Sequence, residues 1–351
     1  MENFVQRVQD ISIGGRYHLV RKLGSGSFGD VYIGRDAETG NEVALKLEHY
    51  SVEPSLLRDE VYIYQSLAGE VGFPQVYWHG QQDDYTVLVF ELLGPNLEDV
   101  FRFCCNQFSL KTTLMLADQL LRRLETLHSN DYLHRDIKPE NFLLGMGERG
   151  NIIYMTDLGL AIYRHPDGWS SSRASARVVA ARPPELLGTC RYASINAHLG
   201  IAQSRRDDLE ALGYMLVYFM RGRLPWQGLK AKGDAKNLLV LEKKQATSAN
   251  ELCAGLPTEF ADYMNYVYNL RYEDRPDYQS LRKMFKGLFH RQGFENDNVF
   301  DWTIREFQRL EPDAQESLPS NSVGDRRGED STKPPDNGAQ DATKATHQKR
   351  R

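Results

Sequence analysis

The sequence predicts an α+β protein in which a small strand-rich part precedes a larger, mainly helical part. Three early runs are typical of strands: residues 17–23 alternate, residues 31–34 are β-branched and aromatic, and residues 43–46 are apolar. In the second part, leucines recur at helical spacing over residues 112–129. The 351 residues, of which 41% are hydrophobic, can bury one large core or two modest ones.

A glycine-rich run separates the first two predicted strands: Leu23-Gly24-Ser25-Gly26-Ser27-Phe28-Gly29-Asp30-Val31. A GxGxxG pattern alone is weak, because dinucleotide-binding proteins share it. A dinucleotide-binding turn must lead into a helix, whereas this run leads into a strand, so we expect a hairpin. Its glycines would let backbone N–H groups approach phosphates, with Phe28 closing over them.

Residues 134–141 contain the side chains that phosphoryl transfer needs. Asp136 can accept the proton of an attacking hydroxyl, Lys138 can neutralise charge on the moving phosphate, and Asn141 can hold a metal ion. Mixed-charge loops after helices are common, but three suitable residues at these offsets argue against chance.

A second candidate metal ligand, Asp157, follows a predicted strand at 152–155 and precedes Leu158-Gly159. An Asp at such a place often only forms a turn. Its position sixteen residues after Asn141 favours a ligand that bridges nucleotide phosphates through Mg²⁺.

Four further segments carry recognisable motifs: residues 91–99, 188–196, 204–210 and 224–230. With the motifs above, they resemble the eukaryotic protein kinases, and casein kinase I in particular. Most kinases end the activation segment with Ala-Pro-Glu, whereas casein kinase I has Ser-Ile-Asn, as at 194–196 here; Pro183-Pro184-Glu185 is a decoy at the wrong place. The chain departs from the family at 164–187 and after about residue 310.

The resemblance implies a two-lobed protein-kinase fold with a small β-rich N-lobe and a larger, mainly helical C-lobe. We expect an N-terminal extension over residues 1–16, the N-lobe over 17–93, the C-lobe over 94–305 and a disordered tail over 306–351. From about Glu311 the chain is polar, with too few aliphatic residues to order itself by burial.

The resemblance also implies binding of ATP and Mg²⁺. Lys46 would contact the α- and β-phosphates and pair with a helix glutamate, for which the motif favours Glu60 over Asp59 and Glu53. Apolar residues at 57, 61 and 64 suggest one stripe of that helix. Adenine would bond to backbone near Glu91 and Leu93.

The resemblance also implies structural roles for three more residues. Phe90 would lie at the back of the adenine slot, and Leu158, where kinases usually have Phe, would pack beneath the helix carrying Glu60. Asp208 precedes a predicted helix over 209–220 and could be its N-cap; the resemblance implies a structural carboxylate that holds the 134–141 backbone, and the two roles are compatible.

Substrate choice is the most specific expectation. Arg191 matches a family position that binds an anion, and Lys236 is a weaker second member. The resemblance then implies preference for Ser or Thr placed three residues after a phosphoserine, or after acidic residues. Alternatively, Arg191 makes a structural ion pair.

These features predict a serine/threonine kinase of casein kinase I type that acts on acidic or pre-phosphorylated proteins, because Lys138 replaces the Ala-Ala-Arg of tyrosine kinases. The alternatives are a pseudokinase scaffold with little catalysis and a small-molecule kinase on the same fold. We expect a monomer.

Composition bears on location and partners. Four cysteines without a CxxC predict neither disulfides nor a zinc site, and a net charge of −5 argues against nucleic-acid binding. We expect no signal peptide and no membrane anchor, and a cytoplasmic or nuclear location.

Two segments have open interpretations. The tail is either an inert linker or a site of autophosphorylation at Ser317, Ser320, Ser322, Ser331, Thr332, Thr343 and Thr346. Residues 169–177 lack periodicity and are predicted to be mobile and dispensable for basal activity.

Overall fold

The computed structural model describes residues 12–26, 29–52, 55–163 and 186–316, with side chains as far as residue 310. Several predictions lie outside the described residues: those for Ser27, Phe28, Glu53, the loop 169–177, residues 183–185, and the Ser and Thr residues of the tail from 317 onward.

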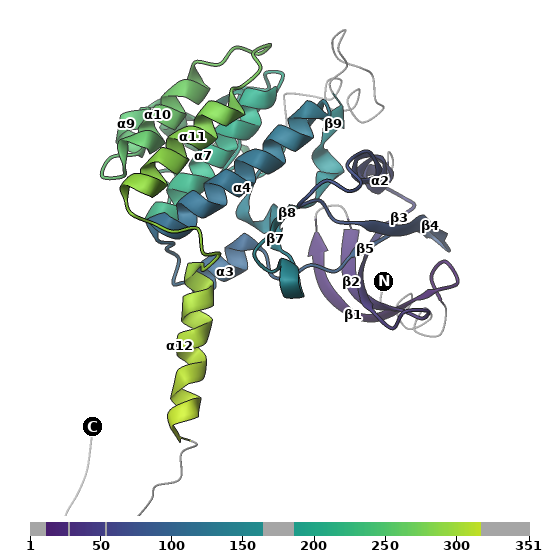
Figure 1. Cartoon of the computed structure of the whole chain (residues 1–351). Helices are drawn as coiled ribbons and strands as arrows, with labels where there is room; N and C mark the ends of the chain where they lie inside the picture. Colours follow the sequence, from purple (N-terminus) through teal and green to yellow (C-terminus); the bar gives the residue numbers. More distant parts are fainter. Residues whose placement is uncertain (1–11, 27–28, 53–54, 164–185, 317–351) are drawn as a thin grey trace, which may run out of the picture. The chain divides into compact units, whose positions relative to one another are not determined.

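A five-stranded antiparallel sheet forms the N-lobe (Figure 1). Its spatial order is β1-β2-β3-β5-β4, with β1 (Tyr17–Gly26), β2 (Gly29–Asp36), β3 (Glu42–His49), β4 (Val76–Gln82) and β5 (Tyr85–Glu91). Val43, Leu45 and Leu47 join an apolar cluster that includes Val87 of β5. Because side chains alternate along a strand, Lys46 takes the opposite face of β3.

Helix α2 (Leu56–Ser66) packs beside this sheet (Figure 1). The Glu48 carboxylate fixes where the helix begins, because it accepts hydrogen bonds from the N–H groups of Leu56 and Leu57, both at 3.1 Å. A carboxylate at a helix N-terminus satisfies unpaired donors and matches the helix dipole. The predicted stripe at 57, 61 and 64 is buried, at 1–3% exposure.

The C-lobe is built from helices (Figure 1). They are α3 (Leu97–Phe103), α4 (Leu110–Ser129), α6 (Ile195–His198), α7 (Arg205–Arg221), α8 (Gly233–Gln245), α9 (Ala249–Leu252), α10 (Thr258–Tyr268) and α11 (Tyr278–Arg291). The leucines that predicted α4, namely Leu116, Leu120, Leu124 and Leu127, are each 0% exposed. Burying one leucine contributes roughly 1.5–3 kcal/mol, so this stripe anchors α4 against α7 and α11.

Short elements follow α4 and bring two loops together. Strand β6 (Tyr132–Leu133) pairs with β9 (Ile162–Tyr163), and β7 (Phe142–Leu144) pairs with β8 (Ile153–Met155). Turns of 3-10 helix lie at η1 (Pro139–Asn141), η2 (Gly147–Arg149) and η3 (Leu158–Leu160). The two strand pairs bracket both the 134–141 loop and Asp157, so these candidate residues lie side by side.

Two predicted boundaries differ from the structure. Ile13 is 0% exposed and bridges to Tyr17, so residues 12–16 of the predicted extension are part of the N-lobe. Helix α12 (Asp301–Glu316) runs through residue 306, where the tail was predicted to begin. The compact unit of the chain ends at Phe307, close to the predicted boundary, so composition missed only the helix that continues beyond it. The polar residues after 306 are mostly good helix formers, and Trp302, stacked on Phe300, anchors the first turn.

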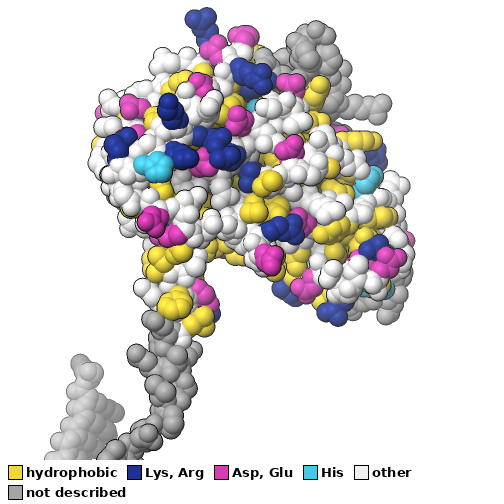
Figure 2. All heavy atoms as spheres, viewed as in Figure 1, with side chains coloured by type: hydrophobic (Ala, Val, Ile, Leu, Met, Phe, Trp, Pro, Cys, Tyr) yellow, Lys and Arg dark blue, Asp and Glu magenta, His cyan; other side chains and the backbone are white. Residues whose placement is uncertain are grey.

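Charges of both signs are interspersed over the C-lobe surface (Figure 2). Asp118 of α4, for example, pairs with Arg122 of the same helix at 3.0 Å and with Arg282 of α11 at 2.9 Å. Among the described helices, none combines the length and the apolar character needed to span a membrane.

Candidate active site

Asp136 lies at the centre of the 134–141 loop and is 6% exposed. Its Oδ1 accepts hydrogen bonds from both the backbone N–H and the hydroxyl of Thr189, each at 2.8 Å. Its Oδ2 accepts from the Lys138 ammonium, and its backbone carbonyl accepts from the Asn141 amide at 2.9 Å. The three residues predicted from spacing alone therefore meet, and an unassigned residue, Thr189, joins them.

A buried carboxylate holds the backbone of this loop. Asp208 accepts hydrogen bonds from the N–H groups of His134 and Arg135, both at 2.8 Å, and lies 2.8 Å from His128 Nε2. Burial would raise the pKa of Asp208, but the bond to His128 and the other donors lower it, so the group is a carboxylate. Helix α7 begins at Arg205, which places Asp208 within its first turn; the N-cap interpretation is wrong and the structural one is confirmed.

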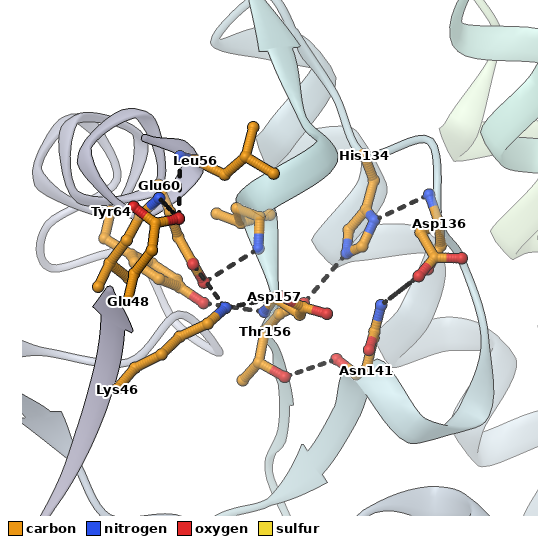
Figure 3. A network of polar contacts seen from close by, with 12 residues as sticks. Lys46, Glu48, Leu56, Glu60, Tyr64, His134, Asp136, Asn141, Thr156 and Asp157 are labelled. Carbon is orange, nitrogen blue, oxygen red and sulfur yellow. Dashed lines mark hydrogen bonds and ion pairs between the residues drawn. The ribbon is translucent and has the colours of Figure 1, made fainter. Parts of the chain in front are cut away.

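The ammonium of Lys46 lies between two carboxylates from distant parts of the chain (Figure 3). Its Nζ is 2.7 Å from Glu60 Oε2 and 2.8 Å from Asp157 Oδ1. Asp59, the other described candidate, is not its partner. Helix α2 positions Glu60, the β3 face opposite the apolar cluster positions Lys46, and the turn after β8 positions Asp157.

Burial and pairing compete in this trio. Burial lowers the pKa of an amine, yet the two carboxylates reverse this and raise the pKa of Lys46. Burial would also raise the pKa of Asp157, but Lys46 prevails and lowers it. Glu60 is the most enclosed member, and burial raises its pKa. Lys46 is thus firmly cationic, and Asp157 is firmly anionic.

Asp157 adopts a left-handed backbone conformation, with φ of 59°. Such a conformation is costly for a non-glycine residue and marks a site where the surrounding contacts enforce it. Those contacts come from α2: the Tyr64 hydroxyl accepts the Asp157 N–H, and Glu60 Oε1 accepts the Leu158 N–H at 3.2 Å. Leu158 is 0% exposed and its turn packs against α2, which confirms its predicted place.

The loop 134–141 and the Asp157 loop are also joined to each other. His134 Nε2 lies 3.2 Å from the carbonyl of Thr156, and the Thr156 hydroxyl donates to the Asn141 carbonyl at 3.1 Å (Figure 3). The Thr156 N–H donates to the same carbonyl at 2.9 Å. Asn141 uses its amide nitrogen to bond Asp136, which leaves its amide oxygen for a cation. Asn141 and Asp157 thus offer two adjacent oxygen donors, the ligand type that Mg²⁺ prefers.

The described part of the glycine run forms a hairpin, as predicted. Gly24 pairs with Val31, Ser25 with Asp30 and Gly26 with Gly29, so β1 returns as β2 rather than entering a helix. Leu23, Gly24 and Ser25 are exposed. Val31 pairs with Lys46 across β2 and β3, which places the hairpin next to the trio.

Comparison with known families bears on this arrangement of residues. The family described as "Protein kinase domain" matches residues 17–285, more than half of the chain. The chain belongs to the protein kinase domain family. This confirms the predicted kinase fold, with its small β-sheet N-lobe followed by a helical C-lobe. The family supports a kinase function, and its members generally use ATP and Mg²⁺.

Glu91 and Leu93, the two residues predicted to lie near the adenine of this protein kinase, differ in their hydrogen bonding. The Glu91 carboxylate lies 2.9 Å from Arg149 of η2 and accepts the Gln75 N–H, so its side chain joins the N-lobe to the C-lobe and has protein partners. Neither backbone group of Leu93 has a backbone partner among the described residues, which leaves both for a nucleotide. Phe90 stacks on Tyr64 of α2, consistent with a place at the back of the adenine slot.

The carboxylate of Asp30, a residue predicted to contact the cofactor, is bound by side chains of the N-lobe. Its carboxylate is 5% exposed and lies 2.9 Å from Lys22 Nζ, while the Tyr32 hydroxyl donates to it at 3.4 Å. These bonds tie β1 to β2 at the base of the hairpin. The described contacts of Asp30 are thus with protein.

The two predicted anion residues, Arg191 and Lys236, lie in different segments of the C-lobe. The Arg191 guanidinium packs against the rings of Tyr192 and Tyr218, at 5.7 and 5.5 Å. No carboxylate of the described residues forms an ion pair with it, so the alternative interpretation of Arg191 gains no support. Lys236 is exposed on α8; burial raises the pKa of the Cys190 thiol, while the fields of Lys244 and Lys236 oppose this rise.

Sequence reasoning gave no role to Thr189 or Tyr64. Thr189 lies in a segment that supported the family resemblance, and the preceding Gly188 was a usable signal. Gly188 has φ of 85°, and a Cβ there would lie 2.6 Å from the Arg135 carbonyl, so only glycine lets this segment reach Asp136. For Tyr64 no local signal exists, since its apolar neighbours already explained it as part of a buried stripe.

Proposed function

We propose that the protein is a serine/threonine kinase of casein kinase I type, which transfers the γ-phosphate of ATP to Ser or Thr of acidic or pre-phosphorylated proteins. The observation that carries the proposal is the joint assembly of two groups of residues. Asp136, Lys138 and Asn141 meet at one loop, and Lys46 is paired with both Glu60 and Asp157.

Each residue then has one task. Asp136 orients the substrate hydroxyl and accepts its proton, and Lys138 stabilises negative charge on the transferring group. Lys46 positions the nucleotide phosphates, while Glu60 keeps Lys46 in place. Asn141 and Asp157 hold Mg²⁺, which supplies charge neutralisation at the phosphates.

The metal requirement fits the donors present. Among the described residues no group of three or more His, Cys, Asp or Glu side chains is placed to hold a metal ion. Mg²⁺ in kinases is bound by one or two protein oxygens together with substrate phosphates and water, and two such oxygens are what Asn141 and Asp157 provide.

Hydroxyl specificity rests on Lys138 and Thr189. Both bond the Asp136 carboxylate, one at each oxygen, so the activation segment and the catalytic loop meet at the proton acceptor. The preference for acidic or pre-phosphorylated proteins rests on Arg191, whose guanidinium packs against two tyrosine rings and forms no ion pair with a carboxylate among the described residues, although the field of Glu98 reaches it. Because no described carboxylate pairs with it, this guanidinium is available for a phosphate.

The test is transfer of labelled phosphate from ATP to casein in the presence of Mg²⁺. We expect Ser and Thr to be labelled and tyrosine not, with the Asp136→Asn variant inactive. A wild-type chain that binds ATP without transfer would favour the pseudokinase alternative. Transfer to a small metabolite but not to protein would favour the small-molecule alternative.

A further inference from the structure

A second buried lysine, Lys244, lies outside the group formed by Lys46, Glu60 and Asp157. Lys244 of α8 is 1% exposed, yet its ammonium is not neutralised by an adjacent carboxylate in the described structure. It donates hydrogen bonds to two backbone carbonyls, at 3.0 Å to Cys190 and at 2.5 Å to Ala193. Its Nζ also lies 3.2 Å from His198 Nε2. Burying a cation is costly unless its donors are satisfied, so this arrangement requires a reason.

The walls around this ammonium are aromatic. The ring centroids of Tyr214 and Trp226 lie 5.0 and 5.2 Å from Nζ, within the range of cation–π attraction. Burial lowers the pKa of Lys244 to about 7, and the field of Glu210 partly offsets this. Glu210 itself accepts the Ile195 N–H and the Tyr214 hydroxyl. The surroundings of Lys244 therefore favour an ammonium, which can donate several hydrogen bonds at once.

The two carbonyls that Lys244 binds flank Arg191 and Tyr192. Two further restraints complete the turn: the indole N–H of Trp226 donates to the Arg191 carbonyl at 2.7 Å, and the Tyr192 N–H donates to the Thr189 carbonyl at 2.9 Å. The carbonyls of residues 189, 190, 191 and 193 therefore each have a partner. Lys244 supplies two of these four restraints.

We propose that Lys244 is a positioning residue for substrate recognition: its ammonium fixes the 190–193 turn so that the Arg191 guanidinium is held ready for a phosphate on the substrate. The inference rests on the proposed anion site at Arg191. A preorganised cation binds more tightly because no ordering cost is left for the binding step. Lys244 touches neither substrate nor nucleotide and acts through the turn.

The test compares Lys244→Met with Lys243→Met. Lys243 is the preceding residue of α8 and is exposed, so both variants replace one lysine of the same helix by methionine. Each is assayed with a peptide that carries phosphoserine three residues before the acceptor serine and with its unphosphorylated counterpart. We expect Lys244→Met to raise the KM for the phosphorylated peptide roughly tenfold more than that for the other, and Lys243→Met to leave the ratio of the two KM values unchanged.

Two additional variants separate positioning from simple loss of structure. Lys244→Arg keeps the charge and should restore part of the preference. Trp226→Phe keeps an aromatic wall but removes the bond to the Arg191 carbonyl, and should lower the preference even if Lys244→Met does not fold. Equal increases in both KM values for Lys244→Met, or for Trp226→Phe where the lysine variant does not fold, would overturn the inference.

The inference and the proposed function fail in different ways. If the wild type does not distinguish the two peptides but still transfers phosphate, the anion site is wrong and the role of Lys244 falls with it. If the wild type prefers the phosphorylated peptide and Lys244→Met keeps that preference, the anion site stands and only the role of Lys244 is wrong.

Discussion

The hydroxyl of Tyr64 accepts a hydrogen bond from the backbone N–H of Asp157, across 3.1 Å. Tyr64 belongs to α2 and Asp157 to the turn after β8, so this bond connects the two lobes of the kinase at its predicted metal ligand. Burial raises the pKa of Tyr64 well above 10, which keeps the hydroxyl protonated. The same helix supplies Glu60, so α2 controls both Lys46 and the backbone of Asp157.

Replacing Tyr64 by Phe should weaken catalysis. The change leaves the partly buried Asp157 N–H without its acceptor, which costs roughly 1–3 kcal/mol. If the lost bond destabilises the conformation of Asp157 that binds the metal, kcat should drop about tenfold, because 1.4 kcal/mol corresponds to one power of ten in rate. The control is Tyr62→Phe, because Tyr62 lies on the same helix and is 63% exposed. An unchanged kcat for Tyr64→Phe would show that Asp157 holds its conformation without this bond.

Asp157→Asn and Lys46→Arg should each abolish transfer without unfolding the protein. Lys46 keeps Glu60 as a partner in the first variant, and the second keeps the positive charge. We expect kcat to fall by about 100–1,000-fold or more, because the loss of one preorganised electrostatic contact has an effect of that size. Lys46→Met should differ, because it leaves the buried Glu60 unpaired and thus also lowers the melting temperature. Retained activity in Asp157→Asn or Lys46→Arg would contradict the assigned roles.

Arg191→Ala should affect substrates according to their charge. Loss of the guanidinium removes charge-assisted bonds to a phosphate, so the KM for a peptide with phosphoserine three residues before the acceptor should rise about tenfold or more. The KM for the unphosphorylated peptide should change little. Steady-state kinetics with the two peptides measures both values. Equal effects on both would indicate a structural role for Arg191.

His198 should contribute an acid-sensitive part of the stability. Burial, with the field of Lys244, lowers its pKa from 6.5 to about 4. Between these values the unfolded chain binds the proton and the folded chain does not, so acid favours unfolding. The free energy of unfolding should therefore rise with pH from about 4 to 6.5 and level off above. Denaturant titrations of His198→Gln should show a shallower rise; an unchanged slope would mean that His198 is protonated in the folded protein.

The sequence alone determined the order of the motifs and the periodicity of the main elements. The leucines of α4 and the stripe at 57, 61 and 64 of α2 follow local spacing, so their burial was predictable. The grouping of Asp136, Lys138 and Asn141 was equally local, because all three lie within one loop. Family resemblance added Lys46 and Asp157 as members of one site.

Only the tertiary structure decided which distant groups meet. It paired Lys46 with Glu60 rather than Asp59, and it added Asp157, 111 residues away from Lys46, to the same ammonium. It also brought Thr189 to Asp136, Tyr64 to Asp157 and Lys244 to the turn that carries Arg191. These contacts depend on how strands and helices pack against each other, and local periodicity carries no information about that packing. For the same reason, a buried lysine such as Lys244 has the sequence signature of an ordinary surface residue until the fold encloses it.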